Sequence, residues 1–291
     1  MQKCEITRNF CTSYIAQPLG LVRETPQSRA ETLLSDDVRE KWEREQEELK
    51  KKMVLEDSED LKVMASTSDS DMQGKRFYVA GVDISFVKGD DVNACAALVV
   101  LSFPDLETVY SDCQMIQLTE PYIPGFLGFR EVPFIVDLFE KLRQEKPQYL
   151  PHVVMVDGNG ILHPKGFGSA CHMGVMLNLP CIGVAKKLFQ VDGLENDAEH
   201  KEKIEALKAG GDTFPLVGNS GRTLGMALRS CNNTKNPVYV SPGNLVTMDT
   251  AVRLVHKCCK HRVPDPVRLA DINSREYLRV NFKPEPAADS T

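Results

Sequence analysis

The densest run of hydrophobic positions lies in the second quarter of the chain. It divides into three stretches, 76–85, 92–103 and 107–118, which are separated by short turn sequences rich in Gly, Asp and Pro. Apolar runs of this length between such turns are typical of β-strands. The pattern therefore predicts three strands in an antiparallel meander.

Helical spacing of apolar residues takes over at about Glu131. Val132, Ile135 and Phe139 fall on one face of a helix that follows a loop rich in Pro and Gly. Strand and helix patterns then alternate through most of the remaining chain. The predicted strands are 152–157, 181–185, 223–229 and 237–241, and the predicted helices are 167–178, 198–208, 247–261 and 265–279. Periodicity alone predicts a mixed α/β fold.

The N-terminal quarter is organised differently. Residues 1–34 show no sustained period and are predicted to be flexible. Ser35 begins a capping sequence for a helix that runs to about Leu55, with Trp42 on its apolar stripe. The acidic, serine-rich stretch 56–71 predicts a mobile connection. The charged faces of the helix leave open whether it docks on the core or recruits another protein.

These patterns divide the chain into four parts. They are a flexible segment (1–34), the helix with its acidic connection (35–73), one α/β domain (74–283) and a flexible tail (284–291). With 291 residues, 42% of them hydrophobic, the chain is long enough to bury one substantial core and still carry an appendage.

Two features of the composition bear on location. No apolar run approaches the ~20 residues that cross a bilayer, and the first residues lack the apolar core of a secretory signal. The nine cysteines, mostly within apolar runs, indicate reduced thiols rather than disulfides. We therefore expect a protein of the cytoplasm, the nucleus or both, the nucleolus included, with no membrane partner.

One dense cluster, from His256 to His261, holds two histidines and two cysteines and invites a zinc interpretation. It lacks the second paired cluster that is typical of closed zinc sites, so structural zinc is disfavoured.

Net charge does not decide for or against a nucleic-acid partner. The formal charge is -6, but residues 1–73 alone carry 11 basic and 16 acidic side chains. The remainder, with 24 basic and 25 acidic side chains, is close to neutral and can still present a local basic face.

Two aspartates stand at strand positions that are otherwise apolar. Asp83 lies within one predicted strand, and Asp157 ends another. Removing water from a carboxylate costs several kcal/mol unless a cation or hydrogen bonds replace it. The pair therefore predicts charge gathered around a metal, and Glu131 adds a third oxygen donor of the kind that suits Mg²⁺ or Mn²⁺. The alternative, a carboxylate that merely caps a helix or a turn, is stronger for Glu131 than for Asp83.

Four motifs around these carboxylates resemble the endonuclease V family and occur in that family's order. They run from Gly81 to Phe86, from Pro121 to Glu131, from Val156 to Gly160 and from Gly183 to Lys187. The Asp-Gly-Asn-Gly form of the third motif is similar to the animal branch. The resemblance implies a ribonuclease H-like α/β fold, in which helices flank a mixed sheet and the N-terminal helix is an extension. It also implies that residues 74–283 form the catalytic domain.

The resemblance further implies an activity. The expected enzyme is a metal-dependent endoribonuclease that cuts inosine-containing RNA at the second phosphodiester bond 3′ to inosine, leaving a 3′-hydroxyl and a 5′-phosphate. A close alternative is a repair endonuclease that cuts deaminated DNA by the same chemistry, and a distant one is an inosine-RNA binding module without turnover. The expected partner is single-stranded RNA, with deaminated DNA second, and the protein is expected to be a monomer.

By resemblance and by charge, Asp83, Glu131 and Asp157 are expected to hold Mg²⁺, for which Mn²⁺ can substitute. If two ions bind, Asp83 is the candidate bridge. Lys186 matches the family's lysine near the scissile phosphate. The alternative for Lys186 is a solvated pair with Lys187.

A second group of residues is implied to bind the substrate. Tyr122 matches the aromatic residue of the family's wedge, Pro121-Tyr122-Ile123-Pro124, although a loop aromatic is also compatible with simple packing. Gly125, Gly128 and Gly158 would let the backbone approach a flipped base.

Two histidines near these motifs receive different expectations. His163 is implied to contact phosphate or ribose, with a turn-forming role as the alternative. His172, in an apolar helical stretch, is expected to be a packed residue.

Two further positions are accessory candidates. Asp271 is interpreted as an outer acidic residue near the site, with a helix cap or an arginine pair as the alternative. Asn244 stands where the family usually has a histidine, and it can form hydrogen bonds but cannot shuttle a proton. We expect catalysis to survive this change, because the three carboxylates remain, with an effect on metal preference.

Overall fold

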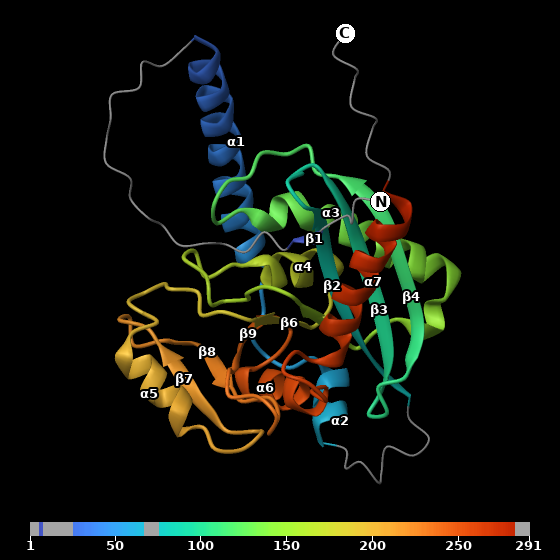
Figure 1. The fold of residues 1–291 in the computed structure, drawn as a ribbon, viewed down its shortest axis with the longest axis vertical. Helices are drawn as coiled ribbons and strands as arrows, with labels where there is room; N and C mark the ends of the chain where they lie inside the picture. The colour runs from blue at the N-terminus through green and yellow to red at the C-terminus, as the bar shows by residue number, and fades with distance from the viewer. Residues whose placement is uncertain (1–5, 8–25, 67–75, 283–291) are drawn as a thin grey trace.

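The computed structural model describes residues 6–7, 26–66 and 76–282, and it is built on one mixed β-sheet (Figure 1). The strands are β1 (Ile6–Thr7), β2 (Phe77–Val87), β3 (Asn93–Phe103), β4 (Thr108–Gln117), β5 (Val153–Val156), β6 (Cys181–Ala185), β7 (Thr213–Val217), β8 (Thr223–Leu228) and β9 (Val238–Asn244). Their order across the sheet is β4-β3-β2-β5-β6-β9-β8-β7, with β1 paired to the end of β2.

The type of strand pairing changes twice across this sheet, from antiparallel to parallel and back. β4, β3 and β2 form the predicted antiparallel meander, whereas β2, β5 and β6 run parallel to one another. β9, β8 and β7 then continue the sheet antiparallel. The prediction of a mixed sheet with the ribonuclease H-like order of elements is confirmed.

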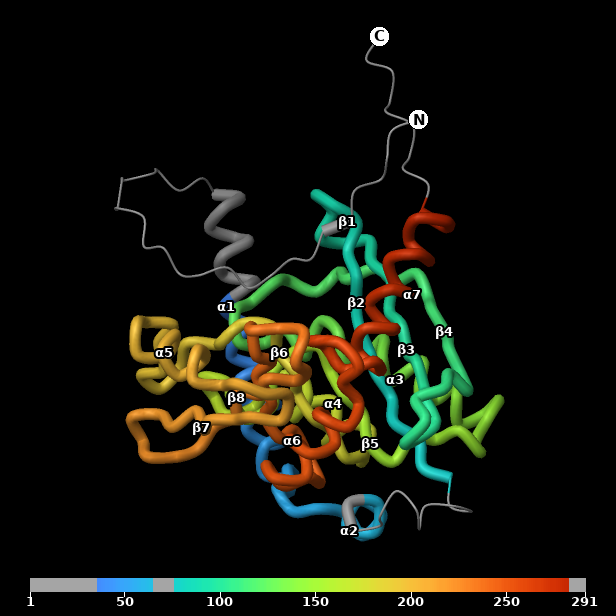
Figure 2. Tube along the Cα trace, turned by 60° about the horizontal axis from the view of Figure 1, so that its bottom comes forward, coloured from blue at the N-terminus to red at the C-terminus, as the bar shows by residue number. Residues whose placement is uncertain are grey.

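Helices cover both faces of the sheet (Figures 1 and 2). They are α1 (Pro26–Lys50), α2 (Glu59–Ser66), α3 (Leu127–Glu145), α4 (Ser169–Leu177), α5 (Ala198–Ala206), α6 (Met248–Lys257) and α7 (Asp265–Asn281), with a short 3₁₀ turn at Pro147–Tyr149. Residues of α2, α6 and α7 share one large hydrophobic core with the sheet, and residues of α3 and α4 share a second large core with it. In the described residues, no helix is both long and apolar enough for a membrane crossing.

The two cores explain why β2 and β3 are apolar at nearly every position. Val79 and Leu101 point into the core under α7, whereas Val82 and Leu98 point into the core under α3. Strands that are covered on both faces have no solvent side on which polar residues could alternate. A polar residue such as Asp83 in β2 therefore needs a specific environment.

The N-terminal prediction is wrong in part. α1 begins at Pro26, so residues 26–34 are helical, and Ile6–Thr7 form a strand, where flexibility was expected for the whole of 1–34. Residues 1–5 and 8–25 lie outside the described residues. α1 also ends at Lys50 instead of Leu55, because the following backbone bonds to the end of β9: Val54 N donates to Asn244 Oδ1 at 3.0 Å.

The predicted mobile connection at 56–71 is also wrong for Glu59–Ser66, which form α2. Ser58 Oγ accepts from the backbone of Leu61 at 3.3 Å, the bond expected of a helix cap. Leu61 and Met64, one turn apart, are almost fully buried in the core. Residues 67–71 of that stretch and the predicted tail at 284–291 lie outside the described residues.

The other predicted elements are found with boundaries that differ by up to one helical turn. α3 begins at Leu127, so Glu131 lies in its second turn, later than predicted. Pro133 is therefore accommodated inside the helix. The edge strand β7 was not predicted, and it contains Pro215, which interrupts the usual strand pattern.

A candidate active site beside the ends of the parallel strands

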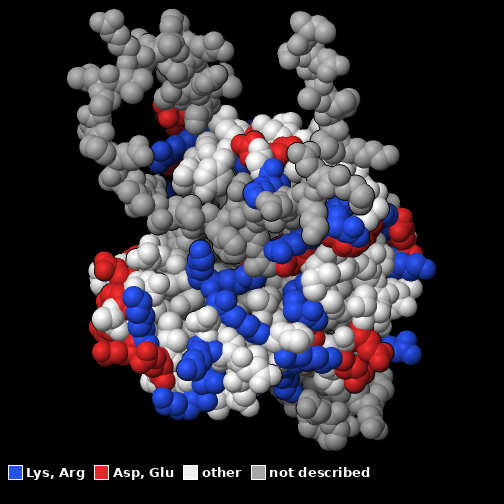
Figure 3. Space-filling view, viewed as in Figure 1, with Lys and Arg blue, Asp and Glu red and all other residues white. Residues whose placement is uncertain are grey.

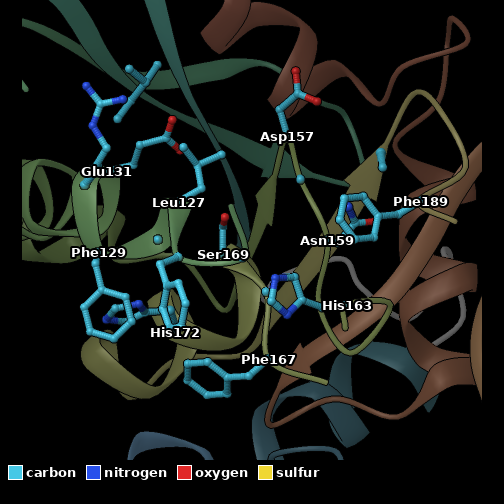
Figure 4. A pocket seen from close by; sticks show the side chains of 18 of the residues that line it. Leu127, Phe129, Glu131, Asp157, Asn159, His163, Phe167, Ser169, His172 and Phe189 are labelled. Atoms are coloured by element: carbon cyan, nitrogen blue, oxygen red, sulfur yellow. The ribbon is translucent and has the colours of Figure 1, made fainter. Parts of the chain in front are cut away.

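A cavity of about 570 Å³ opens where β2, β5 and β6 end (Figure 4). The carboxyl ends of neighbouring parallel strands meet at one edge of a sheet, so the loops that follow them gather there. Its walls come from the end of β2, the start of α3, the loops after β5 and β6, and Gln46 of α1.

The sheet register brings Asp83 and Asp157 together. Val82 of β2 is the partner of Val156 in β5, and each aspartate is the next residue of its strand or of the loop that follows. Glu131 reaches the same cavity from α3. The structure thus gathers the three predicted carboxylates at one cavity.

Asp83 is held by the hydroxyl groups of two serines. The hydroxyls of Ser85 and Ser274 each lie 2.9 Å from its Oδ2 and can donate to it. Burial, and then the neighbouring charges of Asp157 and Asp271, raise the pKa of Asp83 to about 6 despite these bonds. The surroundings of Asp83 therefore disfavour its ionised form.

The pKa of Glu131 is raised further than that of Asp83, for the same physical reasons. Burial, followed by the charges of Asp83 and Asp157, raises the pKa of Glu131 to about 8, while Arg130 opposes that rise. Two carboxyls with raised pKa values beside a third are typical of a functional site, since a bound cation would relieve the repulsion.

Lys186 extends from the end of β6 and forms an ion pair with Asp157. Its backbone carbonyl accepts a hydrogen bond from Arg262 at 2.6 Å, which ties the loop after β6 to the segment before α7. Lys186 therefore lies inside the site, and the alternative of a solvated lysine pair does not hold for it.

The chemistry of the donor set fits a hard divalent cation, because the three carboxylates supply only oxygen ligands and repel one another. As the side chains are placed, however, no three His, Cys, Asp or Glu residues in the described part of the chain are arranged to hold an ion. Ligation by all three would require their carboxylates to approach one another. Asp157 would also have to leave its ion pair with Lys186 in order to bind the cation. The cluster from His256 to His261 does not form a metal-binding group either.

The side of the cavity away from the carboxylates is aromatic. Figure 4 shows Phe129, Phe167, His172, His163 and Phe189 around it, with Glu131 and Asp157 on the other side. The rings of His163 and Phe189 are nearly parallel, with centroids 6.0 Å apart. Flat apolar walls beside charged groups suit a planar heterocycle that is attached to a phosphate chain.

The glycines that line the cavity differ in why they are needed. Gly125 has a φ of +86°, which favours glycine, and a Cβ at Gly128 would lie 2.8 Å from His172 Nδ1. A Cβ at Gly158 would meet only ordinary contacts, with Ser169 Cβ the nearest at 3.7 Å. All three line the cavity.

The wedge Pro121-Tyr122-Ile123-Pro124 contributes unequally. Tyr122 lines the cavity and is 52% exposed, so it is not simply packed. Ile123 is buried against Trp42 and Phe126, and it anchors the loop. Pro121 and Pro124 are exposed and do not line the cavity.

The two histidines are both neutral at pH 7. Burial, and then the charges of Lys50 and Lys165, lower the pKa of His163 to about 4, and burial lowers the pKa of His172 to about 4. His163 also accepts a hydrogen bond from the backbone of Lys165 at 3.3 Å, as in the turn-forming alternative. His172 packs against Phe129, as predicted, but also lines the cavity.

Neither accessory candidate lines the cavity. Asp271 lies on α7, is paired with Arg275 at 2.9 Å and acts on the site through its charge on Asp83. Asn244 is buried at the end of β9, where it donates to Gly174 O at 3.0 Å and accepts from Val54 N. It holds β9 to α4 and to the chain after α1.

Sequence reasoning missed several residues of the site. Gln46 and Phe189 line the cavity, and Ser274 contacts Asp83. Each lies outside the four motifs, and Gln46 sits among charged residues on a helix whose partner was unknown. Ser85, two residues after Asp83 in the same strand, and Phe129 at the start of α3 were missed although both lie inside a motif.

Comparison with known proteins gives one consistent result. A family model described as Endonuclease V matches residues 59–272. Endonuclease V of Mus musculus is 57% identical over 238 residues, which cover 82% of this chain and 69% of the mouse protein. Endonuclease V of Homo sapiens is 56% identical, and the match covers 82% of each protein.

Solved structures agree with these sequence matches. The catalytic domain of human Endonuclease V superposes with a TM-score of 0.79 at 52% identity, covering 84% of this chain and 96% of that domain. Ciona intestinalis Endonuclease V, in complex with a 24mer DNA containing an inosine followed by a ribo-adenosine, has a TM-score of 0.74 at 31% identity. That match covers 84% of this chain and 98% of the Ciona chain.

Proposed function

The chain belongs to the endonuclease V family and is a hydrolase of phosphodiester bonds, and from that premise we propose that it is a metal-dependent endoribonuclease for inosine-containing RNA. The proposed cut is at the second phosphodiester bond 3′ to inosine, with 3′-hydroxyl and 5′-phosphate products. The observation that carries the proposal is a single cavity with repelling carboxylates on one side and aromatic walls on the other.

In this proposal Asp83, Glu131 and Asp157 hold the cation, Mg²⁺ first and Mn²⁺ as a substitute. A bound divalent ion lowers the pKa of its water and neutralises charge on the phosphate. If a second ion binds, Asp83 is positioned to bridge, because it lies beside Asp157 and its charge also acts on Glu131.

The other residues act directly on the substrate. Once Asp157 is engaged elsewhere, the ammonium of Lys186 is free to stabilise charge on the scissile phosphate. The rings around the cavity and the backbone of Gly125, Gly128 and Gly158 receive the flipped base. His163 is uncharged at pH 7, so a contact with ribose suits it better than a contact with phosphate.

Basic side chains support a nucleic-acid partner. Figure 3 shows Lys and Arg gathered across the middle of one face, over β6, β9 and the start of α7 in the view of Figure 1. The acidic side chains visible in that view lie mostly toward its sides. A local basic surface on a molecule with net charge -6 favours contact with a phosphate backbone.

The preference for RNA over DNA is the part of the proposal that needs a direct comparison of substrates. The nucleic acid in the Ciona complex, a 24mer DNA containing an inosine followed by a ribo-adenosine, is compatible with both. Matched oligonucleotides with inosine at one position, in all-ribo, all-deoxy and single-ribo forms, provide the test. Faster metal-dependent cleavage of the all-ribo strand at the second bond supports the proposal, and preference for the all-deoxy strand would favour the DNA-repair alternative. Specific binding of inosine strands without cleavage in either metal would favour the binding module.

We also propose that the protein acts as a monomer in the cytoplasm, the nucleus or both. The cysteines within the described residues are free thiols, which suits a reducing compartment. Light scattering of the purified full chain tests the oligomeric state, and imaging of the tagged full chain tests the location.

A further inference from the structure

α1 lies before the start of the family match at residue 59, yet it reaches the cavity. Its inner face carries Trp42, Gln46 and Lys50, which are spaced one helical turn apart. Figure 1 shows the lower part of α1 close to α4, and Trp42 also contacts Phe129 at the start of α3.

Gln46 joins two walls of the cavity. Its side chain is only 3% exposed, and Nε2 donates to Gly125 O at 3.2 Å and to Phe167 O at 3.3 Å. Gly125 belongs to the loop that follows the wedge, and Phe167 to the loop after β5. One amide group thus links the two loops that carry the glycine and aromatic walls.

Two neighbours on α1 hold the same two walls. Trp42 packs against Phe126 at the end of the first loop, and it stacks on Phe129 of α3 with ring centroids 5.2 Å apart and planes inclined by 15°. Lys50 Nζ donates to Lys165 O at 2.6 Å, in the loop that includes Phe167. Because these three contacts are spread along the helix, α1 fixes both the distance and the angle between the walls.

We propose that Gln46 is a positioning residue for base recognition, which holds the Gly125 and Phe167 walls at the separation that a flipped hypoxanthine requires. This inference rests on the proposed function, since it assumes that the cavity receives the base. Gln46 does not need to touch the substrate for this role. A buried amide that bridges two carbonyls of different loops is costly to replace, because both acceptors lose their donor.

Single-turnover cleavage by the full chain tests the proposal. The variant Gln46→Leu keeps the helix propensity of the side chain, is one atom shorter and removes both hydrogen bonds. Two strands are compared in Mg²⁺, one with a central inosine and one with adenosine at that position. We expect the half-saturating enzyme concentration for the inosine strand to rise about tenfold, as loss of two hydrogen bonds would give, and the preference over adenosine to fall similarly.

Two controls separate positioning from loss of stability. Glu47→Leu makes the same new side chain at the next, exposed position of α1, and it should leave the preference for inosine unchanged. Leu61→Ala in α2 removes a buried side chain away from the cavity, and it should lower the melting temperature without changing the preference.

The outcomes are distinguishable. A wild type that prefers inosine and a Gln46→Leu variant with the same preference would overturn the role of Gln46 and leave the proposed function intact. A wild type without any preference for inosine would overturn the proposed function and this inference with it. Loss of preference in Leu61→Ala as well would show that general destabilisation explains the effect, and would also overturn the positioning role.

Discussion

At the scale of single residues, Lys186 and the proposed cation compete for the carboxylate of Asp157. Its carboxylate is paired with Lys186 in a cavity where Asp83 and Glu131 already carry raised pKa values. Lys186 therefore neutralises part of the negative charge while no cation is bound. The same ammonium lies where the proposed reaction needs a positive group near the phosphate.

Replacement of Lys186 by Met separates these two roles. We expect single-turnover cleavage to fall about 100-fold, as when one electrostatic donor is lost from a reaction centre. Affinity for the divalent ion should not weaken, since a competitor for Asp157 has been removed. Metal titration of cleavage measures both quantities, with Lys201→Met on the exposed side of α5 as the control. A variant with weaker metal binding and an unchanged maximal rate would contradict this assignment.

Asn244 illustrates a position whose family motif suggests chemistry and whose surroundings suggest support. The change Asn244→Ala removes the donor to Gly174 O and the acceptor for Val54 N. We expect the free energy of unfolding to fall by about 1–3 kcal/mol, with the ratio of cleavage rates in Mg²⁺ and Mn²⁺ unchanged. Urea unfolding and metal-dependent cleavage provide the two measurements. If Asn244→Ala altered the metal preference without changing stability, Asn244 would have a role at the metal site and the structural role would be wrong.

At the scale of secondary-structure elements, the close approach of α7 to β2 governs the environment of Asp83. Gly81 makes this possible, because a Cβ there would lie 2.0 Å from the carbonyl carbon of Pro266. The same helix brings Ser274 to Asp83 and places Asp271 near it. A glycine in the first motif thus serves packing, two residues before the aspartate that serves chemistry.

The variant Gly81→Ala should therefore lower stability and disturb the site together. We expect a loss of at least ~1–3 kcal/mol in the free energy of unfolding, because backbone atoms have to move apart. Gly89→Ala is a suitable comparison, since Gly89 has a φ of +79° but nothing within 4 Å of an added Cβ. Its cost should be limited to the backbone conformation, about 1 kcal/mol, with cleavage unchanged. Chemical denaturation of both variants gives the comparison.

At the scale of the whole molecule, folding assembles negative charge that the unfolded chain keeps apart. The pKa values of Asp83 and Glu131 are both above their ordinary values, so the folded state binds these protons more tightly than the unfolded state. The associated stability is present below the ordinary carboxyl pKa. It is lost as pH rises through about 6 for Asp83 and about 8 for Glu131.

The variant Glu131→Gln is expected to remove most of this loss of folding stability at rising pH. Between pH 5 and pH 8 in EDTA, the stability of the variant relative to the wild type should rise by at least ~1.4 kcal/mol, the equivalent of one pKa unit. Taking the difference cancels the titration of unrelated groups. Added Mg²⁺ should stabilise the wild type more at pH 8 than at pH 5, and should stabilise the variant less. Equal effects of Mg²⁺ on both proteins would argue against Glu131 as a ligand.

The amino-acid sequence by itself determined the carboxylates of the site and, apart from β7, the strands and helices of the main domain. Asp83 and Asp157 were recognisable because a charged residue in an apolar strand is costly, and that cost depends only on local pattern. The antiparallel meander and the later alternation of elements followed from periodicity. The packing role of α2 was hidden, because only Leu61 and Met64 mark its buried face within an acidic stretch.

Only the tertiary structure decided which distant segments meet. It brought Gln46 of α1 between two loops, paired Lys186 with Asp157 and placed Asn244 away from the cavity. The physical reason is that a hydrophobic pattern specifies which face of an element is buried but not the surface that covers it. That partner is selected by the fit of the assembled core, and so is the environment of each polar residue beside it.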